Sequence, residues 1–353
     1  MNRYIRVLHL PVNNGSRTSH TVRALRQIGV DAFGLVRTRA LVQSPAGLRI
    51  INLGSRRPSG QLLRSILPWV HNFLKYVRWA DVIHWYSGAM ALPFGLDLAL
   101  VRRLHKPGIV EWQGSEIRIP EVEFAENPYY RQAYPNGYEY RKTESLDQSR
   151  CLQKRFHDAG FATVSPLGML QYVQRDLFPD VYVVPVRLIM SDYEPAFPSP
   201  FRQRAVVIHS PTAPITKGTA AVLSAVQQLE NRLDFEFRLV QGLSRDEAIR
   251  LTREADVFLD QFVLGDFGSA ALEAMAFGKP VICYIKPSLA TLYSPELPIL
   301  SATQEELASV LERVLTDPGL RHDLGRRSRA YVEKHHNALN VAHRLKEIYE
   351  EVA

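Results

Sequence analysis

Short runs of Val, Ile, Leu and Phe alternate along this chain of 353 residues with segments in which apolar residues recur at helical spacing. Alternation of this kind is typical of parallel βαβ units, in which a helix follows each strand and covers the sheet. The strands predicted in the first half span residues 4–10, 32–36, 49–53, 81–86, 108–112, 161–164 and 182–186. Those predicted in the second half span residues 205–210, 235–240, 256–260 and 280–284. The pattern predicts an α/β fold with two doubly wound, Rossmann-like domains.

A segment with three prolines and no clear period, residues 187–204, separates the two alternating blocks and is typical of an inter-domain connection. We therefore expect a first domain over 1–186 and a second over 205–335. The last helical segment, 336–353, has no strand after it and is expected to pack back on the first domain. Helices are predicted over 18–28, 89–104, 245–254, 270–277, 320–334 and 338–351, and after Lys217 and Gln304. Because ligands bind at the carboxyl ends of strands in open α/β sheets, a cleft between the domains is expected.

Positive charge is concentrated in one part of the chain. The 43 Lys and Arg residues exceed the 36 Asp and Glu residues by seven, and residues 32–80 contain no acidic residue. The basic residues of that stretch are Arg37, Arg39, Arg49, Arg56, Arg57, Arg64, Lys75 and Arg78. Residues 62–77 have apolar positions at helical spacing, which predicts an amphipathic helix with Pro68 as a point of restart.

Two kinds of anionic partner fit this basic stretch. Over residues 56–79 the basic side chains are accompanied by Trp69, Tyr76 and Trp79, a combination that suits the headgroup region of an anionic membrane. A basic rim that attracts a soluble anionic acceptor fits equally well. A nucleic-acid partner is not expected, because no helix-turn-helix, RNP motif or finger spacing accompanies the charge.

The remaining composition predicts a cytoplasmic protein, attached at most peripherally to the inner face of a membrane. Cys151 and Cys283 lie far apart, without the spacing of a zinc site or a disulfide framework. No run of 18 apolar residues is present, and the apolar run near the start is too short for a signal peptide.

The most informative motif is GDFGSAALEAMAFGKPVICY, residues 265–284. A glycine turn leads into a helix, whose first N–H groups and positive dipole end suit a phosphate. Glu273, one turn into that helix, suits a ribose diol, because a carboxylate accepts two hydrogen bonds. A second interpretation stays open, in which Gly268 and Gly278 only delimit the helix and Glu273 is a solvated surface residue.

The sequence LEAMAFGKPV, preceded by DFG, resembles the C-terminal signature of the GT-B glycosyltransferases of family 4, the group 1 glycosyl transferases. The pair Lys217-Gly218 resembles the Lys-Gly pair that follows the first strand of that domain. Residues 14–16 (NGS) resemble the family's small-residue loop after strand one, and residues 113–116 (QGSE) resemble its His-Gly-Ser-Asp-like turn. With the similar DVIHWYSG stretch, the resemblance covers nearly the whole chain.

The resemblance implies an enzyme of the EC 2.4 class, a retaining GT-B glycosyltransferase without a metal or other cofactor. Its donor would be a nucleoside-diphosphate sugar, with UDP as the expected nucleotide, held by the second domain. Its acceptor, a glycan, lipid-linked or small molecule, would be held by the first. Catalytic roles are implied for Lys217, which would neutralise the departing diphosphate, and for Gln113 and Asp266. The implied donor-binding residues are Gly15, Ser16, Lys217, Gly218, Phe267, Gly268, Ser269 and Glu273, and the acceptor-side residues are Gln113, Gly114 and Glu116.

Three positions depart from the family's pattern. Gly265, with Asp266 beside it, stands where the family has the first of two paired glutamates, which contacts the transferred sugar. Gln113 replaces a histidine, and an amide can hydrogen-bond a hydroxyl but cannot act as a base, so the donor phosphate is expected to take the acceptor proton. Residues 210–216 lack the usual arginine, which leaves the diphosphate to Lys217, the amides near Gly268 and Arg17.

These departures leave two alternatives open. One is a catalytically silent subunit that binds sugar nucleotides, and the other is a sugar-nucleotide epimerase of the same fold. For Lys217 the alternative is an ordinary solvated lysine.

Other polar and aromatic residues are ambiguous. His9, His84 and His209 are expected as hydrogen-bonded strand-end residues. Five tyrosines within residues 126–142 fit either a packed surface loop or a wall that stacks on an acceptor sugar; they are Tyr129, Tyr130, Tyr134, Tyr138 and Tyr140.

Overall fold

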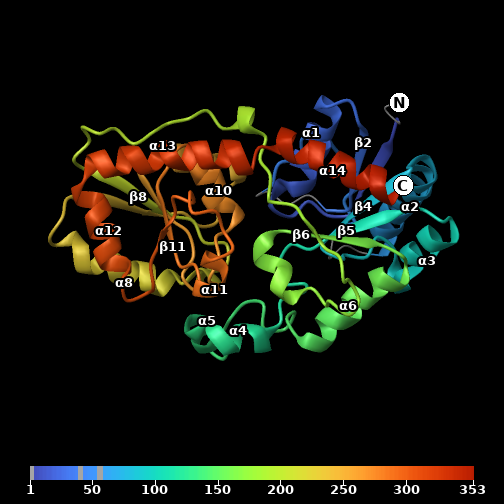
Figure 1. The fold of residues 1–353 in the computed structure, drawn as a ribbon, viewed down its shortest axis with the longest axis horizontal. Coiled ribbons are helices and arrows are strands. Elements are labelled where there is room, and N and C mark those ends of the chain that lie inside the picture. The colour runs from blue at the N-terminus through green and yellow to red at the C-terminus, as the bar shows by residue number, and fades with distance from the viewer. Residues whose placement is uncertain (1–3, 39–42, 54–58) are drawn as a thin grey trace. The chain divides into compact units, whose positions relative to one another are not determined.

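The computed structural model describes residues 4–38, 43–53 and 59–353, with residues 59–64 described by their backbone alone, and the chain forms two compact units (Figure 1). Unit 1 contains residues 1–119, 143–189 and 338–353, and unit 2 contains residues 120–142 and 190–337. The last helix thus belongs to the unit built from the first half of the chain. Residues 120–142 differ from the sequence-based domain boundaries, because they pack with unit 2.

Unit 1 is built on a parallel sheet of seven strands in the order β3-β2-β1-β4-β5-β6-β7. The strands are β1 (Arg6–Leu10), β2 (Asp31–Val36), β3 (Leu48–Ile50), β4 (Val82–Tyr86), β5 (Gly108–Glu111), β6 (Ala162–Ser165) and β7 (Tyr182–Val183). Each lies within or overlaps a predicted apolar run, and β1 and β4 are buried along almost their whole length. Strands buried on both faces read as continuous apolar runs, which is why the sequence located β1 and β4.

The helices of unit 1 are α1 (Arg17–Gln27), α2 (Ser59–Trp79), α3 (Leu96–Arg103), α6 (Leu146–Asp158) and α14 (Ala338–Val352), with short 3₁₀ turns η1 (Asn14–Ser16), η2 (Pro93–Gly95) and η3 (Leu167–Tyr172). Apolar residues of α1 and α14 pack together with the central strands in one buried cluster. Helix α14 therefore completes the core of unit 1, as expected for a terminal helix without a following strand.

Two helices of unit 1 differ from their predictions. The helix expected over 89–104 is confined to α3, because Asp97 accepts hydrogen bonds from the amides of Ala91 (2.5 Å) and Leu92 (3.0 Å) and Phe94 has a positive φ of 58°. Helix α2 runs through Pro68 as one helix.

The aromatic residues expected on the basic side of α2 are largely occupied within the unit. Trp69 is buried and donates to the carbonyl of Ala91 at 2.7 Å, and Tyr76 stacks on Phe33 with ring centroids 3.7 Å apart. The aromatic half of the membrane hypothesis for residues 56–79 is therefore wrong for these two rings. Arg39, Arg56 and Arg57 lie outside the described residues, as does the side chain of Arg64.

Unit 2 is built on a parallel sheet of five strands in the order β12-β11-β10-β8-β9. The strands are β8 (Ala205–His209), β9 (Phe235–Leu239), β10 (Val257–Leu259), β11 (Val281–Cys283) and β12 (Leu300–Ser301). The helices are α4 (Pro120–Glu126), α5 (Pro128–Ala133), α7 (Pro214–Lys217), α8 (Thr219–Glu230), α9 (Arg245–Glu254), α10 (Ser269–Ala276), α11 (Pro287–Ala290), α12 (Leu307–Thr316) and α13 (Pro318–His335), and η4 (Met190–Asp192) precedes the first strand. The two predicted α/β sheets are thus confirmed.

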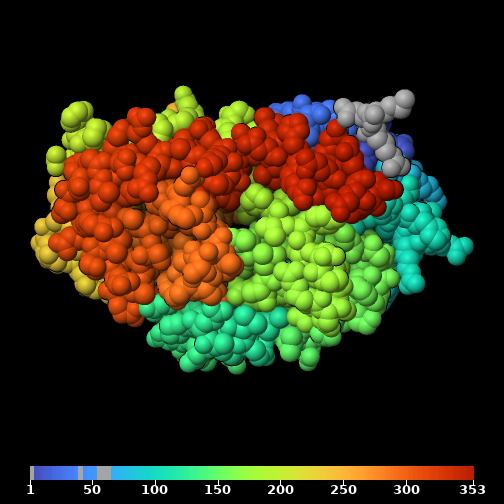
Figure 2. Space-filling model, in the orientation of Figure 1, coloured from blue at the N-terminus to red at the C-terminus, as the bar shows by residue number. Residues whose placement is uncertain are grey.

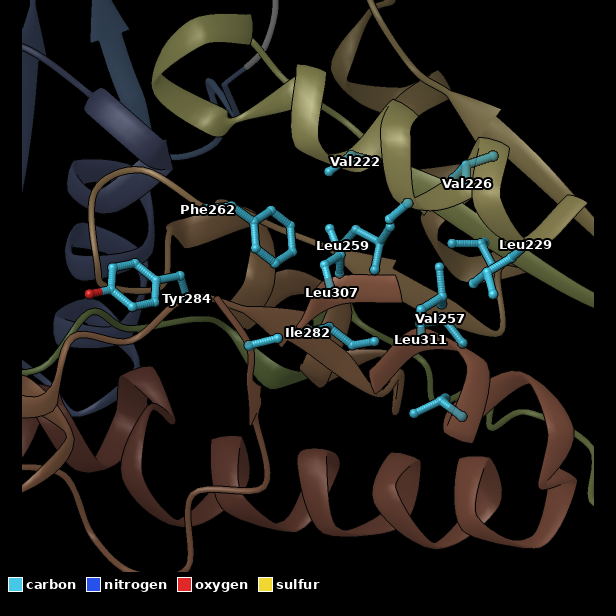
Figure 3. Close-up of a cluster of buried hydrophobic side chains, with 14 of the residues drawn as sticks. Val222, Val226, Leu229, Val257, Leu259, Phe262, Ile282, Tyr284, Leu307 and Leu311 are labelled. Atoms are coloured by element: carbon cyan, nitrogen blue, oxygen red, sulfur yellow. The ribbon is translucent and has the colours of Figure 1, made fainter. Parts of the chain in front are cut away.

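The core of unit 2 lies between its sheet and two of its helices (Figure 3). Side chains of α8 and α12 converge on those of β10 and β11, and Phe262 and Tyr284 extend the cluster. Helix α13 is visible on the outside of this unit in Figure 2. Ser244 and Glu247 form a capping box at the start of α9, so the boundary of that helix was visible in the sequence.

The tyrosine-rich segment 120–142 is an integral part of unit 2. Tyr129, Tyr130 and Tyr138 are buried in the core cluster of that unit, and Asn127 caps α5 while donating to the carbonyl of Val263 at 2.8 Å. Tyr134 and Tyr140 pack against the same cluster. The packed alternative therefore accounts for these rings, although they pack against a core and not over a surface.

Candidate active site

The strongest candidate site lies at the carboxyl edge of the unit 2 sheet, between β8 and β10. These strands are neighbours in the sheet, and the chain leaves them toward β9 on one side and β11 on the other. Such a topological switch point is where open α/β sheets form their ligand-binding crevice. Lys217 ends the short helix after β8, Asp260 follows β10, and α10 begins at Ser269 after the Gly268 cap.

Lys217 is held by the two residues that follow β10. Its Nζ donates to Asp260 Oδ1 at 2.8 Å and to Gln261 Oε1 at 2.9 Å. The Lys217 side chain is 15% exposed and that of Asp260 only 1%. Lys217 is thus not an ordinary solvated lysine, because its ammonium is fixed beside a buried carboxylate.

The same carboxylate also binds the N-terminus of α10, since Asp260 Oδ2 accepts the backbone N–H of Gly268 at 2.6 Å. A Cβ at Gly268 would lie 2.9 Å from Lys217 Nζ, so any larger residue there would displace the ammonium. An ammonium and a helix N-terminus are the two donors that would bind a phosphate. Asp260 currently bridges both of them and balances the charge of Lys217.

Glu273 is held by a tyrosine and an arginine on one side of α10. Its Oε1 accepts hydrogen bonds from the Tyr193 hydroxyl (2.8 Å) and from a terminal nitrogen of Arg245 (2.7 Å). The Glu273 side chain is 21% exposed, and its Oε2 has no hydrogen bond with any part of the described chain. Burial and the neighbouring Glu273 carboxylate raise the pKa of Tyr193, which keeps that hydroxyl a donor. Glu273 is therefore an oriented carboxylate with one oxygen left for a ligand, and not a fully solvated residue.

The turn before α10 explains the missing glutamate. Gly265 has a φ of 71°, and a Cβ there would lie 3.0 Å from the Cβ of Lys286. A glutamate at this position would need a left-handed backbone and a shifted Lys286. Asp266 beside it accepts hydrogen bonds at Oδ1 from the Phe267 amide (2.8 Å) and the Tyr293 hydroxyl (2.7 Å). Asp266 is thus anchored within unit 2.

A second polar cluster lies at the carboxyl edge of the unit 1 sheet and contains the predicted acceptor-side residues. Asn14, next to Gly15 and Ser16, donates to Ser87 Oγ at 3.0 Å, and Ser87 donates to Gln113 Oε1 at 2.6 Å. The backbone N–H of Gln113 donates to Glu116 Oε1 at 2.5 Å across the turn that contains Gly114. Burial raises the pKa of Glu116.

The side-chain nitrogen of Gln113 is buried and has no partner within the described residues. Buried donors are normally hydrogen-bonded, so this nitrogen suits a ligand oxygen. Such an amide can bind a sugar hydroxyl, as the resemblance requires.

Beneath this edge lies a buried ion cluster centred on Glu111. Arg187 binds it with two nitrogens, at 2.6 and 3.1 Å, and Arg17 (3.1 Å) and His84 (3.1 Å) complete its shell. Burial would raise the pKa of Glu111, but Arg187, His84 and Arg17 outweigh it and hold that pKa well below the usual range. The cluster joins residues from a strand, a helix and the predicted linker. Its contact with Glu111 occupies one guanidinium nitrogen of Arg17, the residue that the sequence analysis expected to help bind the diphosphate.

The three strand-end histidines are buried and hydrogen-bonded. His84 also contacts the Tyr349 hydroxyl (2.7 Å), His209 contacts the Leu259 carbonyl (2.9 Å) and Thr219 (3.0 Å), and His9 contacts the Tyr86 hydroxyl (3.0 Å). Burial lowers the pKa of His209 to about 4. These histidines are packed structural residues, as expected.

The structure thus divides the predicted site residues between the two units. Unit 2 brings together Lys217, Gly218, Asp266, Phe267, Gly268, Ser269 and Glu273, and unit 1 brings together Gly15, Ser16, Gln113, Gly114 and Glu116. Sequence reasoning missed Asp260, Gln261, Tyr193 and Arg245. The only signal for the first two was a polar pair directly after the apolar run VFL.

Within the described ranges, no cluster of three or more His, Cys, Asp or Glu residues could hold a metal ion. No helix of that part of the chain is both long and apolar enough to cross a membrane.

Comparison with known proteins identifies the fold. Residues 203–350 match the family model described as glycosyl transferase-like. Among solved structures, the chain is similar to sucrose-phosphate synthase from Thermosynechococcus elongatus, with a TM-score of 0.66 and 14% identity over 99% of both chains. It is similar to WaaG, a glycosyltransferase involved in lipopolysaccharide biosynthesis, with a TM-score of 0.59 and 13% identity over 98% of this chain and 99% of that one.

A third similar structure is Anabaena HepE in complex with UDP and glucose, with a TM-score of 0.55 and 13% identity over 99% of this chain and all of that one. No curated protein matches the sequence. At 13–14% identity these structures show the fold, and the family model supplies the enzyme class. The predicted GT-B fold and glycosyltransferase class are confirmed.

Proposed function

Because residues 203–350 match the glycosyl transferase-like family and the chain has the fold of the GT-B glycosyltransferases, we propose a retaining transferase that uses a UDP-sugar. Its acceptor is a glycan, lipid-linked or small molecule. The observation that carries the proposal is the meeting of Lys217 and the α10 N-terminus at the switch point of the unit 2 sheet. A diphosphate is the anion that both donors suit.

In this proposal the donor binds unit 2. The diphosphate takes over the Lys217 ammonium and the amides of Gly268 and Ser269, and Glu273 accepts the ribose hydroxyls with its free oxygen. The similar HepE structure holds UDP and glucose, which supports UDP as the nucleotide. Asp260 then either shares Lys217 with the diphosphate or releases it.

Transfer breaks the bond between the anomeric carbon and the diphosphate, and the acceptor oxygen forms its bond to the same carbon on the same face. Negative charge grows on the departing phosphate, where Lys217 and the α10 dipole stabilise it. The acceptor proton passes to the departing phosphate oxygen, because Gln113 cannot act as a base. Gln113 instead donates its unpaired N–H to a sugar hydroxyl, and Asp266 lies on the donor side, near the transferred sugar.

We assign the acceptor to unit 1, at the cluster of Gln113, Gly114 and Glu116. The basic stretch 32–80 of the same unit favours an anionic acceptor or a cytoplasmic membrane face that presents it. The Glu116 carboxylate offers a hydrogen-bond acceptor and the side-chain nitrogen of Gln113 offers a donor, so together they can bind hydroxyl groups.

The test is incubation with a panel of nucleotide sugars, followed by chromatography of the products, with nucleotide affinity measured by calorimetry. Slow hydrolysis of one UDP-sugar, with the sugar released in the configuration of the donor, supports the proposal. An altered but intact sugar nucleotide would indicate an epimerase, and binding without turnover a catalytically silent subunit. A protein that binds no nucleotide contradicts all three.

A further inference from the structure

The loop before α3 presents large apolar side chains to solvent. Phe94 is 98% exposed and Leu96 58% exposed. The loop is fixed by Asp97, a fully buried residue whose carboxylate accepts the amides of Ala91 and Leu92. Single exposed apolar residues are common on protein surfaces, but neighbouring ones often mark an interaction surface. Phe94 and Leu96 lie together on a loop that is anchored, so we expect this loop to contact a partner.

An open groove of about 640 Å³ lies beside this loop. Its apolar part includes Phe94, Leu98 and Ala99, and its charged part consists of Arg102, Arg155 and Asp158. All of these residues belong to unit 1. The groove therefore joins an apolar floor to a charged rim, so its occupant should be amphipathic.

The charged rim of the groove has a net positive charge, because its acidic residue is paired and, within the described residues, its two arginines are not. Asp158 is bound by Lys154 at 2.7 Å, and that hydrogen bond holds the pKa of Asp158 below its usual value. The guanidinium groups of Arg102 and Arg155 form no hydrogen bond or ion pair with any other part of the described chain, and both residues are exposed. The groove thus complements an amphipathic anion.

We propose that Phe94, Leu96, Arg102 and Arg155 form a docking surface for an anionic phospholipid bilayer. The two apolar side chains would enter the interface between headgroups and acyl chains, while the two arginines bind lipid phosphates.

The proposal goes beyond sugar transfer and places the membrane contact on different residues from those that the sequence suggested. Trp69 is buried, and Tyr76 is stacked on Phe33, so neither is free to enter a headgroup layer. The region around α3, cyan in Figure 2, reaches the outside of unit 1. The exposed ring is thus on a loop and not on the amphipathic helix.

The test is co-sedimentation at low salt with phosphatidylcholine vesicles, with and without phosphatidylglycerol. We expect the parent protein to bind only the anionic vesicles, and its binding to weaken with salt. Phe94→Ser/Leu96→Ser should reduce the binding by about tenfold or more, since it removes the inserted apolar area. Arg102→Ser/Arg155→Ser should reduce both the binding and its salt dependence.

Matched controls lie in unit 2. Phe201→Ser removes another ring that is 87% exposed, and Arg313→Ser/Arg326→Ser removes two exposed arginines; both should bind vesicles like the parent. Thermal unfolding checks that every variant is folded.

Three outcomes would overturn the proposal. These are a parent protein that stays in the supernatant with anionic vesicles, a Phe94→Ser/Leu96→Ser variant that binds like the parent, and a dimer in sedimentation velocity that depends on Phe94 without vesicles. The last would identify a second copy of the chain as the occupant. UDP affinity should be the same in all variants, so the outcome is independent of the proposed enzyme function.

Discussion

Replacing Lys217 by alanine removes the ammonium from two partners at once, the proposed diphosphate and the buried carboxylate of Asp260. In the free protein, Lys217 Nζ lies 2.8 Å from Asp260 Oδ1 and 2.9 Å from Gln261 Oε1. The substitution should therefore reduce both turnover and stability, for separate physical reasons.

The expected loss of stability follows from the burial of the pair. Asp260 is 1% exposed and keeps the hydrogen bond from the Gly268 amide, but it loses the ion pair with Lys217 that balances its charge. Breaking a fully buried pair costs about 3–5 kcal/mol, and because Lys217 is 15% exposed we expect a smaller loss of stability, about 2–3 kcal/mol. The loss of transition-state stabilisation should be about 2–4 kcal/mol, the usual effect of removing one group that stabilises developing charge.

A matched set of variants separates the two effects: Lys217→Ala, Asp260→Asn and the double variant. Urea unfolding measures stability, and hydrolysis of the UDP-sugar donor measures turnover. The double variant has no buried charge to leave unpaired, so it should regain part of the lost stability while its turnover stays low. Turnover restored in the double variant would show that Lys217 does not serve the leaving group. Parental stability of Lys217→Ala would show that the pair contributes nothing to folding.

Glu273→Gln should weaken UDP binding by about 1–3 kcal/mol in calorimetry, because the ribose loses a charge-assisted acceptor, whereas Tyr193→Phe keeps the carboxylate and should have a smaller effect. Glu111→Gln should destabilise unit 1 by about 3–5 kcal/mol in urea unfolding. The pKa of Glu111 is depressed in the folded protein, so its contribution is present above the unfolded value of about 4.5 and is lost as pH falls below it. His209 has its pKa lowered to about 4 by burial, so between pH 6.5 and 4 only the unfolded chain takes up its proton, and stability falls over that range by up to about 3 kcal/mol. His209→Gln should flatten the pH dependence of thermal unfolding by that amount, and unchanged slopes would contradict the assignment.

The central strands β1, β4, β8 and β10 were predictable because they are buried along almost their whole length, so their burial appears directly as an apolar run. The two-residue edge strand β12 was not predicted. In β4 all five residues are buried, and the run VIHWY contains one polar member, His84. Helix boundaries were predictable where a local signal exists, such as Gly29, whose φ of 82° ends α1. The predicted helix over 89–104 was wrong because its first half is fixed by Asp97, a contact that helical spacing does not encode.

The candidate site was predictable only where a ligand dictates the residue type. Lys217, Gly268 and Glu273 belong to motifs, whereas Asp260 acts through a contact with a lysine 43 residues away in sequence. The Glu111 cluster is similar, because Arg187 reaches that carboxylate from 76 residues away. A charged residue in an apolar segment indicates that some partner exists, but not which one, and these partners become neighbours only when the sheet has formed.

Segment 120–142 shows how such distant contacts determine the site itself. Glu139 accepts hydrogen bonds from the amides of Ile215 (2.8 Å) and Thr216 (2.9 Å) and from the Thr216 hydroxyl (2.7 Å), at the start of α7. Helix α7 has only four residues and ends in Lys217. A helix this short has almost no stability of its own, so its geometry depends on the carboxylate that caps it. The lysine proposed to meet the leaving group is therefore positioned by a residue from the first half of the chain, which folds into unit 2 and there helps to form the proposed donor site.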